Sequence, residues 1–201
     1  MSGLHLHPDE EIEQKADAAL GLTIRSFRQK NKLSLQQVAE QTNLSVGLLS
    51  QIERGISSPS IRVLRAICGV IKLPVHELFT DDMDYNARET RRIVRKQSRR
   101  HINFGSRGMI KEFLTAHDDG TLQVMEIFLE PGGGSGETPY EHEGEECGVI
   151  LEGQMELFVD GTFHTLSEGD SFHFESVLAH KFRNPSDQKC RVLWVTSPPV
   201  W

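Results

Sequence analysis

Apolar residues in the first 80 positions recur at the three- and four-residue spacing of amphipathic helices. Leu20, Ile24 and Phe27 share one helical face and predict a helix over 16–30. Capping signals and apolar stripes predict four more helices: 35–42 after Ser34, with Gln37 in the capping-box position; 46–54 after Ser45, ended by Gly55; one that begins at 61 after Ser60; and 75–79 after Pro74. This half of the chain is expected to form an all-α unit of five short helices.

Beyond about residue 90 the pattern changes to the two-residue alternation of β-strands. The predicted strands cover 92–95, 109–114, 121–129, 147–151, 154–159, 162–166, 171–174, 180–183 and 191–196. Between two of them, Asp160-Gly161 is a typical type I′ hairpin turn. Many short strands at regular spacing predict a β-sandwich or barrel, so the fold class is α+β with two domains.

The two halves also differ in charge. Residues 1–100 contain 16 Lys and Arg against 12 Asp and Glu, which gives +4, whereas residues 101–201 contain 6 against 17, which gives −11. The sum of −7 hides this asymmetry, which indicates two modules with different partners. Residues 20–80 hold eight basic and three acidic residues, a balance of +5 that suits contacts with phosphates.

Other features exclude several classes of protein. No apolar run approaches the roughly 18 residues of a membrane-spanning helix. The first 20 residues lack the apolar stretch of a secretory signal. Cys68, Cys147 and Cys190 are too widely spaced for a disulfide framework or a CxxC metal site. We therefore expect a cytoplasmic protein with no membrane partner.

Residues 34–55 have the spacing of a helix-turn-helix, with a small Ala39 where the two helices approach and a short turn at 42–44. The second helix of this motif enters the major groove, where Gln51 can pair with adenine and Val46 can touch a thymine methyl group. The expected DNA-contacting residues are Ser45, Val46, Gly47, Ser50, Gln51 and Arg54, with Gln36, Arg25 and Arg28 from the preceding segments. Seven basic residues of the connector are expected either to serve the linker or to add phosphate contacts: Arg88, Arg91, Arg92, Arg95, Lys96, Arg99 and Arg100.

The segments LSLQQVAEQTNLSVGLLSQIERG, SPSIRVLRAI and LPVHELF closely resemble the XRE-type, phage-repressor-like DNA-binding domain over residues 20–80. The resemblance implies a λ-repressor-like fold of five helices and binding to double-stranded DNA. Because one such domain offers few base contacts, we expect a homodimer on a pseudo-palindromic operator, joined through the β-rich half.

Residues 105–198 resemble the small cupin barrel, a double-stranded β-helix or jelly roll. Its first motif runs from Gly136 to Gly153 with His142 and Glu146, and its second ends at His180 and Asn184. Two positions depart from the family pattern, since Tyr140 stands in place of the first His and Glu175 in place of the usual Pro. The expected domains are a flexible tail over 1–17, the DNA-binding domain over 18–80, a basic linker with the first strand over 81–104, and the cupin domain over 105–201.

His142, Glu146 and His180 remain as a set of two imidazoles and one carboxylate, which can hold Fe(II), Zn, Mn or Ni and leave coordination positions open. Alternatively, the metal has been lost and these groups bind an organic ligand. In both cases the expected effector pocket is lined by Tyr140, His142, Glu146 and His180, with apolar walls from Phe172, Phe174 and Val149. The stretch 142–146 is similar to the pocket segment of putrescine-utilisation repressors, which implies a polyamine or another amine effector.

The expected function is a sequence-specific transcriptional regulator, in the first place a repressor, whose cupin domain binds a small-molecule effector; we do not expect an enzyme. One alternative is a cupin metalloenzyme, because the mononuclear-iron epoxidase of fosfomycin biosynthesis also joins an XRE-like domain to a cupin with the same spacing of ligands. Another alternative is a metal- or redox-responsive regulator. The basic helix-turn-helix favours a regulator, since an enzyme has no need of it.

Overall fold

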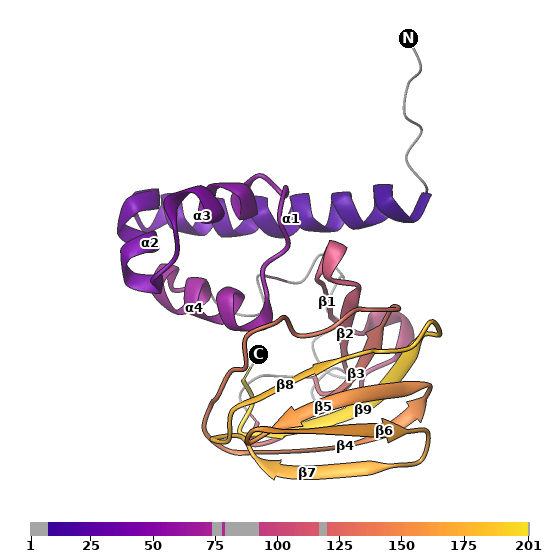
Figure 1. The fold of residues 1–201 in the computed structure, drawn as a ribbon. Coiled ribbons are helices and arrows are strands. Elements are labelled where there is room, and N and C mark those ends of the chain that lie inside the picture. Colours follow the sequence, from indigo (N-terminus) through magenta and orange to yellow (C-terminus); the bar gives the residue numbers. More distant parts are fainter. Residues whose placement is uncertain (1–7, 74–77, 79–92, 117–119, 201) are drawn as a thin grey trace. The chain divides into compact units, whose positions relative to one another are not determined.

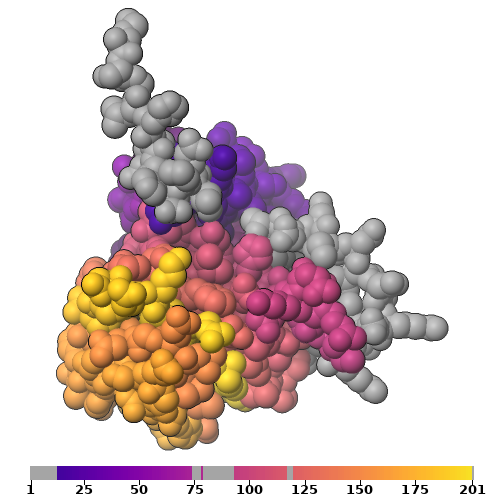
Figure 2. Space-filling view, turned by 90° about the vertical axis from the view of Figure 1, so that its right-hand side faces the viewer, coloured from indigo at the N-terminus to yellow at the C-terminus, as the bar shows by residue number. Residues whose placement is uncertain are grey.

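The computed structural model describes residues 8–73, 78, 93–116 and 120–200. The chain divides into two compact units, one helical and one made of strands (Figure 1). The helical unit contains the residues up to Leu78 and, in addition, the distant segment Asn103–Arg107. The other unit contains the remaining residues, and those after about residue 140 form the orange and yellow surface of Figure 2. The expected α+β class with two domains is confirmed.

The described part of the helical unit contains four α-helices: α1 (Pro8–Lys30), α2 (Leu35–Thr42), α3 (Val46–Glu53) and α4 (Ile61–Ile71). Aliphatic side chains at helical spacing make up its core: Leu20, Ile24, Val38, Leu49, Ile52, Ile61, Leu64, Ile67 and Ile71. Burial of apolar area, at about 25 cal/mol per Å², is the main term that holds such short helices together.

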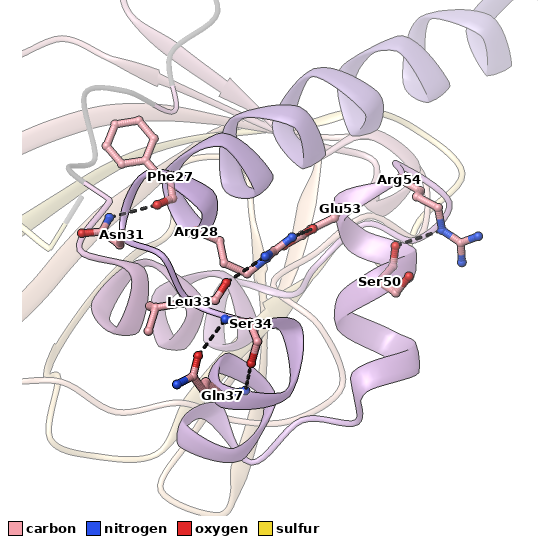
Figure 3. A network of polar contacts seen from close by, with 9 residues as sticks. All are labelled: Phe27, Arg28, Asn31, Leu33, Ser34, Gln37, Ser50, Glu53 and Arg54. Carbon is pink, nitrogen blue, oxygen red and sulfur yellow. Dashed lines mark hydrogen bonds and ion pairs between the residues drawn. The ribbon is translucent and has the colours of Figure 1, made fainter.

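The predicted caps are present. The Ser34 hydroxyl accepts the Gln37 backbone N–H at 3.1 Å, and the Gln37 side chain accepts the Ser34 N–H at 2.8 Å, which completes a capping box (Figure 3). Ser45 and Ser60 cap α3 and α4 through their hydroxyls. Gly55 follows α3 in the left-handed conformation, at φ +67°, which a residue with a side chain rarely adopts.

Helix α1 begins at Pro8, well before the expected start near Ala16. Proline in the first turn and the acidic residues 9–11 are themselves helix-start signals. The apolar periodicity from which the helix was predicted starts later, so residues 8–17 of the expected flexible tail are helical instead. The predicted fifth helix over 75–79 lies outside the described residues, except for the buried Leu78.

Among the residues that the structure describes, nine strands form two sheets, and the pairs from β2 to β9 are antiparallel. The six-stranded sheet has the order β1 (His101–Asn103), β2 (Met109–Phe113), β3 (Gln123–Leu129), β9 (Cys190–Ser197), β4 (Glu145–Glu152), β7 (Ser171–Glu175). The three-stranded sheet has the order β6 (Thr162–Ser167), β5 (Gln154–Val159), β8 (His180–Arg183). Asp160 and Gly161 join β5 to β6 with φ of +46° and +81°, as the predicted type I′ turn requires.

Aromatic side chains pack between the two sheets. The Trp194 ring on β9 lies 4.6 Å from Phe172 on β7 and 4.8 Å from Phe182 on β8, measured between ring centroids. Because β8 belongs to the smaller sheet, the second of these contacts joins the two sheets face to face. This arrangement is a two-layered β-sandwich, and its two sheets are not closed into a continuous barrel.

The first strand differs from its prediction. Residues 93–95 are not a strand, and Ile93 is 49% exposed, whereas β1 lies at His101–Asn103 with Ile102 fully buried. Apolar alternation at 93–95 is therefore not accompanied by a strand in the described residues, and Arg92 lies outside them.

The segment between β1 and β2 also differs from the expected boundary at 104/105. Asn103–Arg107, which includes the short 3-10 helix η3 (Gly105–Arg107), belongs to the helical unit. Phe104 is fully buried, which explains why this segment groups with the helices. Among the described helices, none combines the length and the apolarity that crossing a membrane requires.

Candidate functional site

Helix α3 presents the side chains that were predicted to read DNA. Ser45, Val46, Gly47, Gln51 and Arg54 are exposed, and Ser50 is half-buried. Leu49 and Ile52, on the opposite side of the helix, are fully buried in the core. The helix therefore offers one polar face while its other face fixes it to the unit, as a recognition helix requires.

The polar side chains of this region differ in whether they already form hydrogen bonds within the protein. The Ser45 hydroxyl accepts the Leu48 N–H at 3.1 Å as a cap, and the Arg54 Nε donates to the Ser50 carbonyl at 3.1 Å (Figure 3). On α2, the exposed Gln36 amide donates to Glu40 at 3.0 Å. Within the described residues no hydrogen bond engages the Gln51 amide. Gln51 is thus the amide most available for a base edge.

Arg28 is not available for the predicted phosphate contact. Its Nε and Nη2 donate to Glu53 Oε1 and Oε2 at 2.5 and 2.8 Å, and its Nη1 donates to the Leu33 carbonyl at 2.8 Å (Figure 3). The two side chains are only 11% and 4% exposed. The hydrogen bond to Glu53 raises the pKa of Arg28 above its ordinary value. Arg28 therefore fastens α1 to α3, whereas Arg25 is exposed.

In the strand unit, His142, Glu146 and His180 converge as predicted. Glu146 lies on β4, His180 begins β8, and His142 lies in the segment before β4. Glu146 Oε1 is 3.0 Å from His142 Nε2, and Glu146 Oε2 is 3.4 Å from His180 Nε2. The three side chains are 5%, 4% and 0% exposed, and one ligand atom from each lies within 4.8 Å of the others.

The outer nitrogens of both histidines face backbone carbonyls. His142 Nδ1 lies 2.9 Å from the Glu143 carbonyl, and His180 Nδ1 lies 2.8 Å from the Leu178 carbonyl. A carbonyl can only accept, so each Nδ1 carries a proton. Both Nε2 atoms are directed toward the Glu146 carboxylate. Metal-binding histidines adopt the same orientation, in which the outer nitrogen donates to a backbone carbonyl and the inner nitrogen faces the site.

Three aromatic residues surround this set. Tyr140 is 92% buried, with its ring 4.3 Å from His180, and backbone hydrogen bonds at 3.0 Å in both directions pair the two residues. The Phe174 ring is 5.0 Å from His180, and Phe172 lies beyond it, 6.0 Å from Phe174. The predicted pocket residues Tyr140, Phe172 and Phe174 are therefore brought together with the donor set.

Val149 does not belong to this group. Side chains alternate along β4, and Glu146 shares its face with Gly148 and Ile150, so Val149 points to the other face. Sequence reasoning instead missed Thr196, which is paired with Glu146 in the β4–β9 register and is 99% buried. The alternation of buried positions along β9 was the available signal, but the register that brings Thr196 beside Glu146 is not visible in the sequence.

Two further histidines and the three cysteines lie outside the donor set. His164 and His173 are exposed, and His173 Nε2 pairs with Glu145 at 3.1 Å at the surface. Burial raises the pKa of the Cys68 thiol to about 12 and that of Cys190 to about 11, so both stay protonated at neutral pH. Cys147 is exposed.

Comparison with known proteins agrees with both units. Residues 24–78 match the Helix-turn-helix family, and residues 125–196, which include the whole donor set, match the Cupin domain family. The chain is 29% identical over 184 residues to the HTH-type transcriptional regulator PuuR of Escherichia coli, covering 91% of this chain and 97% of that protein. It is also 29% identical over 170 residues to the regulator SutR of the same organism, covering 84% and 89%.

A crystal structure of an HTH_3 family transcriptional regulator from Vibrio cholerae has the same fold, with a TM-score of 0.62 at 24% identity over 92% of this chain and 98% of that one. The similarity extends across both units and not only across the common helix-turn-helix. The chain therefore combines a helix-turn-helix domain of the XRE type with a cupin domain, and it is homologous to the transcriptional regulators PuuR and SutR.

Proposed function

We propose that this protein is a transcriptional regulator, acting as a repressor in the cytoplasm, whose affinity for its operator changes when its cupin domain binds a cationic effector. The observation that carries the proposal is the buried Glu146 carboxylate, which lies 3.0 Å from His142 Nε2 and 3.4 Å from His180 Nε2. A buried carboxylate requires a positive charge or hydrogen-bond donors beside it, and two imidazole nitrogens and a carboxylate together form a set of cation ligands.

Two cations fit this chemistry. A divalent ion such as Fe, Zn, Mn or Ni would be held by His142, Glu146 and His180, and it would supply a positive charge and open coordination positions. An organic ammonium would instead donate N–H groups to the same acceptors, as the similarity of residues 142–146 to putrescine-utilisation repressors implies. Both cations would balance the charge of the same buried carboxylate, so the experiment has to separate them.

The exposed face of α3 supports operator reading. In this proposal Gln51 and Val46 read base edges, and Arg25 and Arg54 contact phosphates; all four side chains are exposed. Specific affinity requires more contacts than one such face offers, so the operator is bound by a homodimer at two half-sites. An enzyme would have no use for this face, and for this reason we favour a regulator over a cupin metalloenzyme.

The test uses operator fragments that the wild-type protein selects from genomic DNA. Metal-free protein, prepared with a chelator, is titrated with Fe(II), Zn, Mn, Ni or putrescine, and the DNA affinity is measured by fluorescence anisotropy. One of these cations should change the affinity by about 5- to 150-fold, the usual range of coupling between two sites. A response to putrescine in chelator-treated protein identifies the amine, and a response only to one metal identifies the ion.

Two variants make the test specific. Glu146→Gln should abolish the response without changing basal DNA affinity, because it removes the charge that binds the cation. His173→Gln is the matched control, since its imidazole also pairs with a glutamate but lies at the surface. A full response in Glu146→Gln, or no response of the wild type to any of these cations, would refute the proposal.

A further inference from the structure

The loop between β1 and β2 is built into the helical unit, although both strands that it joins belong to the other unit. The chain leaves the strand unit after Ile102, contributes Asn103–Arg107 to the helical unit, and returns to the strand unit at Gly108. Any displacement of β1 or β2 therefore pulls on a segment that is part of the fold of the helices.

One end of this loop is fixed to α1 by a buried carboxylate. Asp17 Oδ2 accepts the Ser106 N–H at 3.2 Å and the Ser106 hydroxyl at 3.0 Å. Asp17 is only 5% exposed, so a carboxylate that lost these two donors would have to be hydrated or neutralised. The buried carboxylate is therefore stabilised by hydrogen bonds from Ser106 only while the loop is in place.

Another part of the loop is fixed to the connection between α3 and α4. The Ser58 hydroxyl donates to the Phe104 carbonyl at 2.5 Å, and the Arg107 Nε donates to the Ser58 carbonyl at 3.0 Å. Ser58 is 4% exposed and Phe104 is fully buried. Ser58 lies five residues after the end of α3, so these contacts hold the segment that follows the recognition helix.

The backbone of the loop is shaped for this position. Gly105 has φ +45°, and a Cβ there would lie 2.1 Å from Asp17 Oδ1, so no other residue fits without displacing the carboxylate. The Gly105 N–H also donates to the Asn103 side chain at 2.8 Å, which closes the turn. A solvated linker would need neither the glycine nor the buried partners.

We propose that Asn103–Arg107 is a clamp that transmits the state of the strand unit to α1 and α3, through Asp17–Ser106 on one side and Ser58–Phe104 on the other. The six-stranded sheet contains both β4, which carries Glu146, and β2, which leaves the clamp. The proposal gives the regulator of the preceding subsection a physical route between its two sites. It depends on that proposed function only for which molecule, bound in the strand unit, changes the state of that unit.

The experiment measures this transmission without any effector. Val192→Ala weakens the core of the strand unit, where Val192 is fully buried on β9. Hydrogen exchange of the α1 amides from 17 to 24 is followed in the full-length protein, in a background with the intact clamp and in the Ser106→Ala background. With the clamp intact, Val192→Ala should speed exchange of these amides by about tenfold or more, because opening of the strand unit frees the loop.

In the Ser106→Ala background the added effect of Val192→Ala should fall below about twofold. Ser58→Ala cuts the other side of the clamp and should act in the same way, which keeps the test valid if one variant folds poorly. Ser26→Ala is the control, since Ser26 is an exposed serine of α1, and it should leave the full effect in place. An equal effect of Val192→Ala with and without Ser106, or no effect with the clamp intact, overturns the proposal.

The hydrogen-exchange experiment requires no effector, so its result can be separated from the effector titration. If the exchange experiment succeeds but no cation alters DNA affinity, the clamp stands and the cationic effector is wrong. If a cation alters DNA affinity equally in wild type and Ser106→Ala, the effector stands and the clamp is overturned.

Discussion

Replacing Glu53 by glutamine tests whether the Arg28–Glu53 pair holds the helical unit together. The substitution keeps the volume of the side chain but removes its charge, and it leaves the Arg28 guanidinium, only 11% exposed, without a counter-charge. Removing one partner of a buried ion pair typically costs about 3–5 kcal/mol. We expect a value near the lower end, about 3 kcal/mol, because the glutamine oxygen can still accept one hydrogen bond and the Leu33 carbonyl retains another.

The loss can be measured in the full-length protein because the α-helices lie in the helical unit. Circular dichroism at 222 nm therefore follows the unfolding of that unit. For a unit of this size, 1 kcal/mol shifts Tm by roughly 4–8 °C, so about 3 kcal/mol predicts a decrease of about 12–24 °C. The double variant Arg28→Met/Glu53→Met should recover most of the loss, since a pair of well-packed apolar groups replaces a buried ion pair at little cost.

A decrease of less than about 1 kcal/mol in Glu53→Gln would refute this reasoning, because it would show that water compensates the guanidinium as an exposed pair allows. Arg25→Ala is the comparison within the same helix. Arg25 is exposed, so its removal should leave Tm unchanged within the ±0.5 kcal/mol that is usual for surface substitutions.

Further expected outcomes concern function and chemistry. Gln51→Ala should lower discrimination between operator and mutated operator by about 1–3 kcal/mol, and unchanged discrimination in a competition assay would mean that α3 is not the recognition helix. Arg25→Ala should weaken binding to all DNA sequences alike and reduce the slope of log K against log salt by about one, whereas an unchanged slope would remove Arg25 from the interface. Neutralising the exposed Arg95 and Lys96 together should reduce the slope by nearly two if the connector contacts phosphates and should leave it unchanged if the connector is only a linker. In native protein near neutral pH, a thiol reagent should modify Cys147 rapidly and spare Cys68 and Cys190, because burial raises the pKa of the latter two thiols to about 12 and about 11; rapid modification of all three would contradict the burial.

The sequence predicted best those features that depend on neighbours along the chain. The Ser34–Gln37 box, the Ser45 and Ser60 caps and the Asp160-Gly161 turn each follow from local backbone chemistry and were predicted at the correct residues. The apolar stripes of the helices and most strand bounds were likewise predicted within two residues. The prediction of His142, Glu146 and His180 as one group depended instead on the resemblance to cupins.

The sequence did not reveal contacts that depend on pairing between distant segments. Arg28 looks like any basic residue of a DNA-binding domain, and only the proximity of Glu53, 25 positions later, turns it into a structural residue. Val149 was assigned to the pocket because it is apolar. It lies three residues after Glu146 on β4, and because side chains alternate along a strand, it points to the other face. The clamp at 103–107 was not predicted, because its hydrogen bonds join residues far apart in the sequence. Phe104 bonds to Ser58, and Ser106 bonds to Asp17.

The interleaved path of the chain has a consequence for how this protein is made. The helical unit needs Phe104 and Ser106, which follow residue 80 by more than 20 positions, so its fold is incomplete when its last predicted helix leaves the ribosome. At about 5–20 residues per second, residues 81–107 take roughly 1–5 s to be synthesised, and during that interval Asp17 and Ser58 have no partners from the loop. In a nascent chain, helices α1 to α4 can therefore form before the loop at 103–107 stabilises them. A fragment that stops at residue 80 should be less stable than one that extends through Arg107.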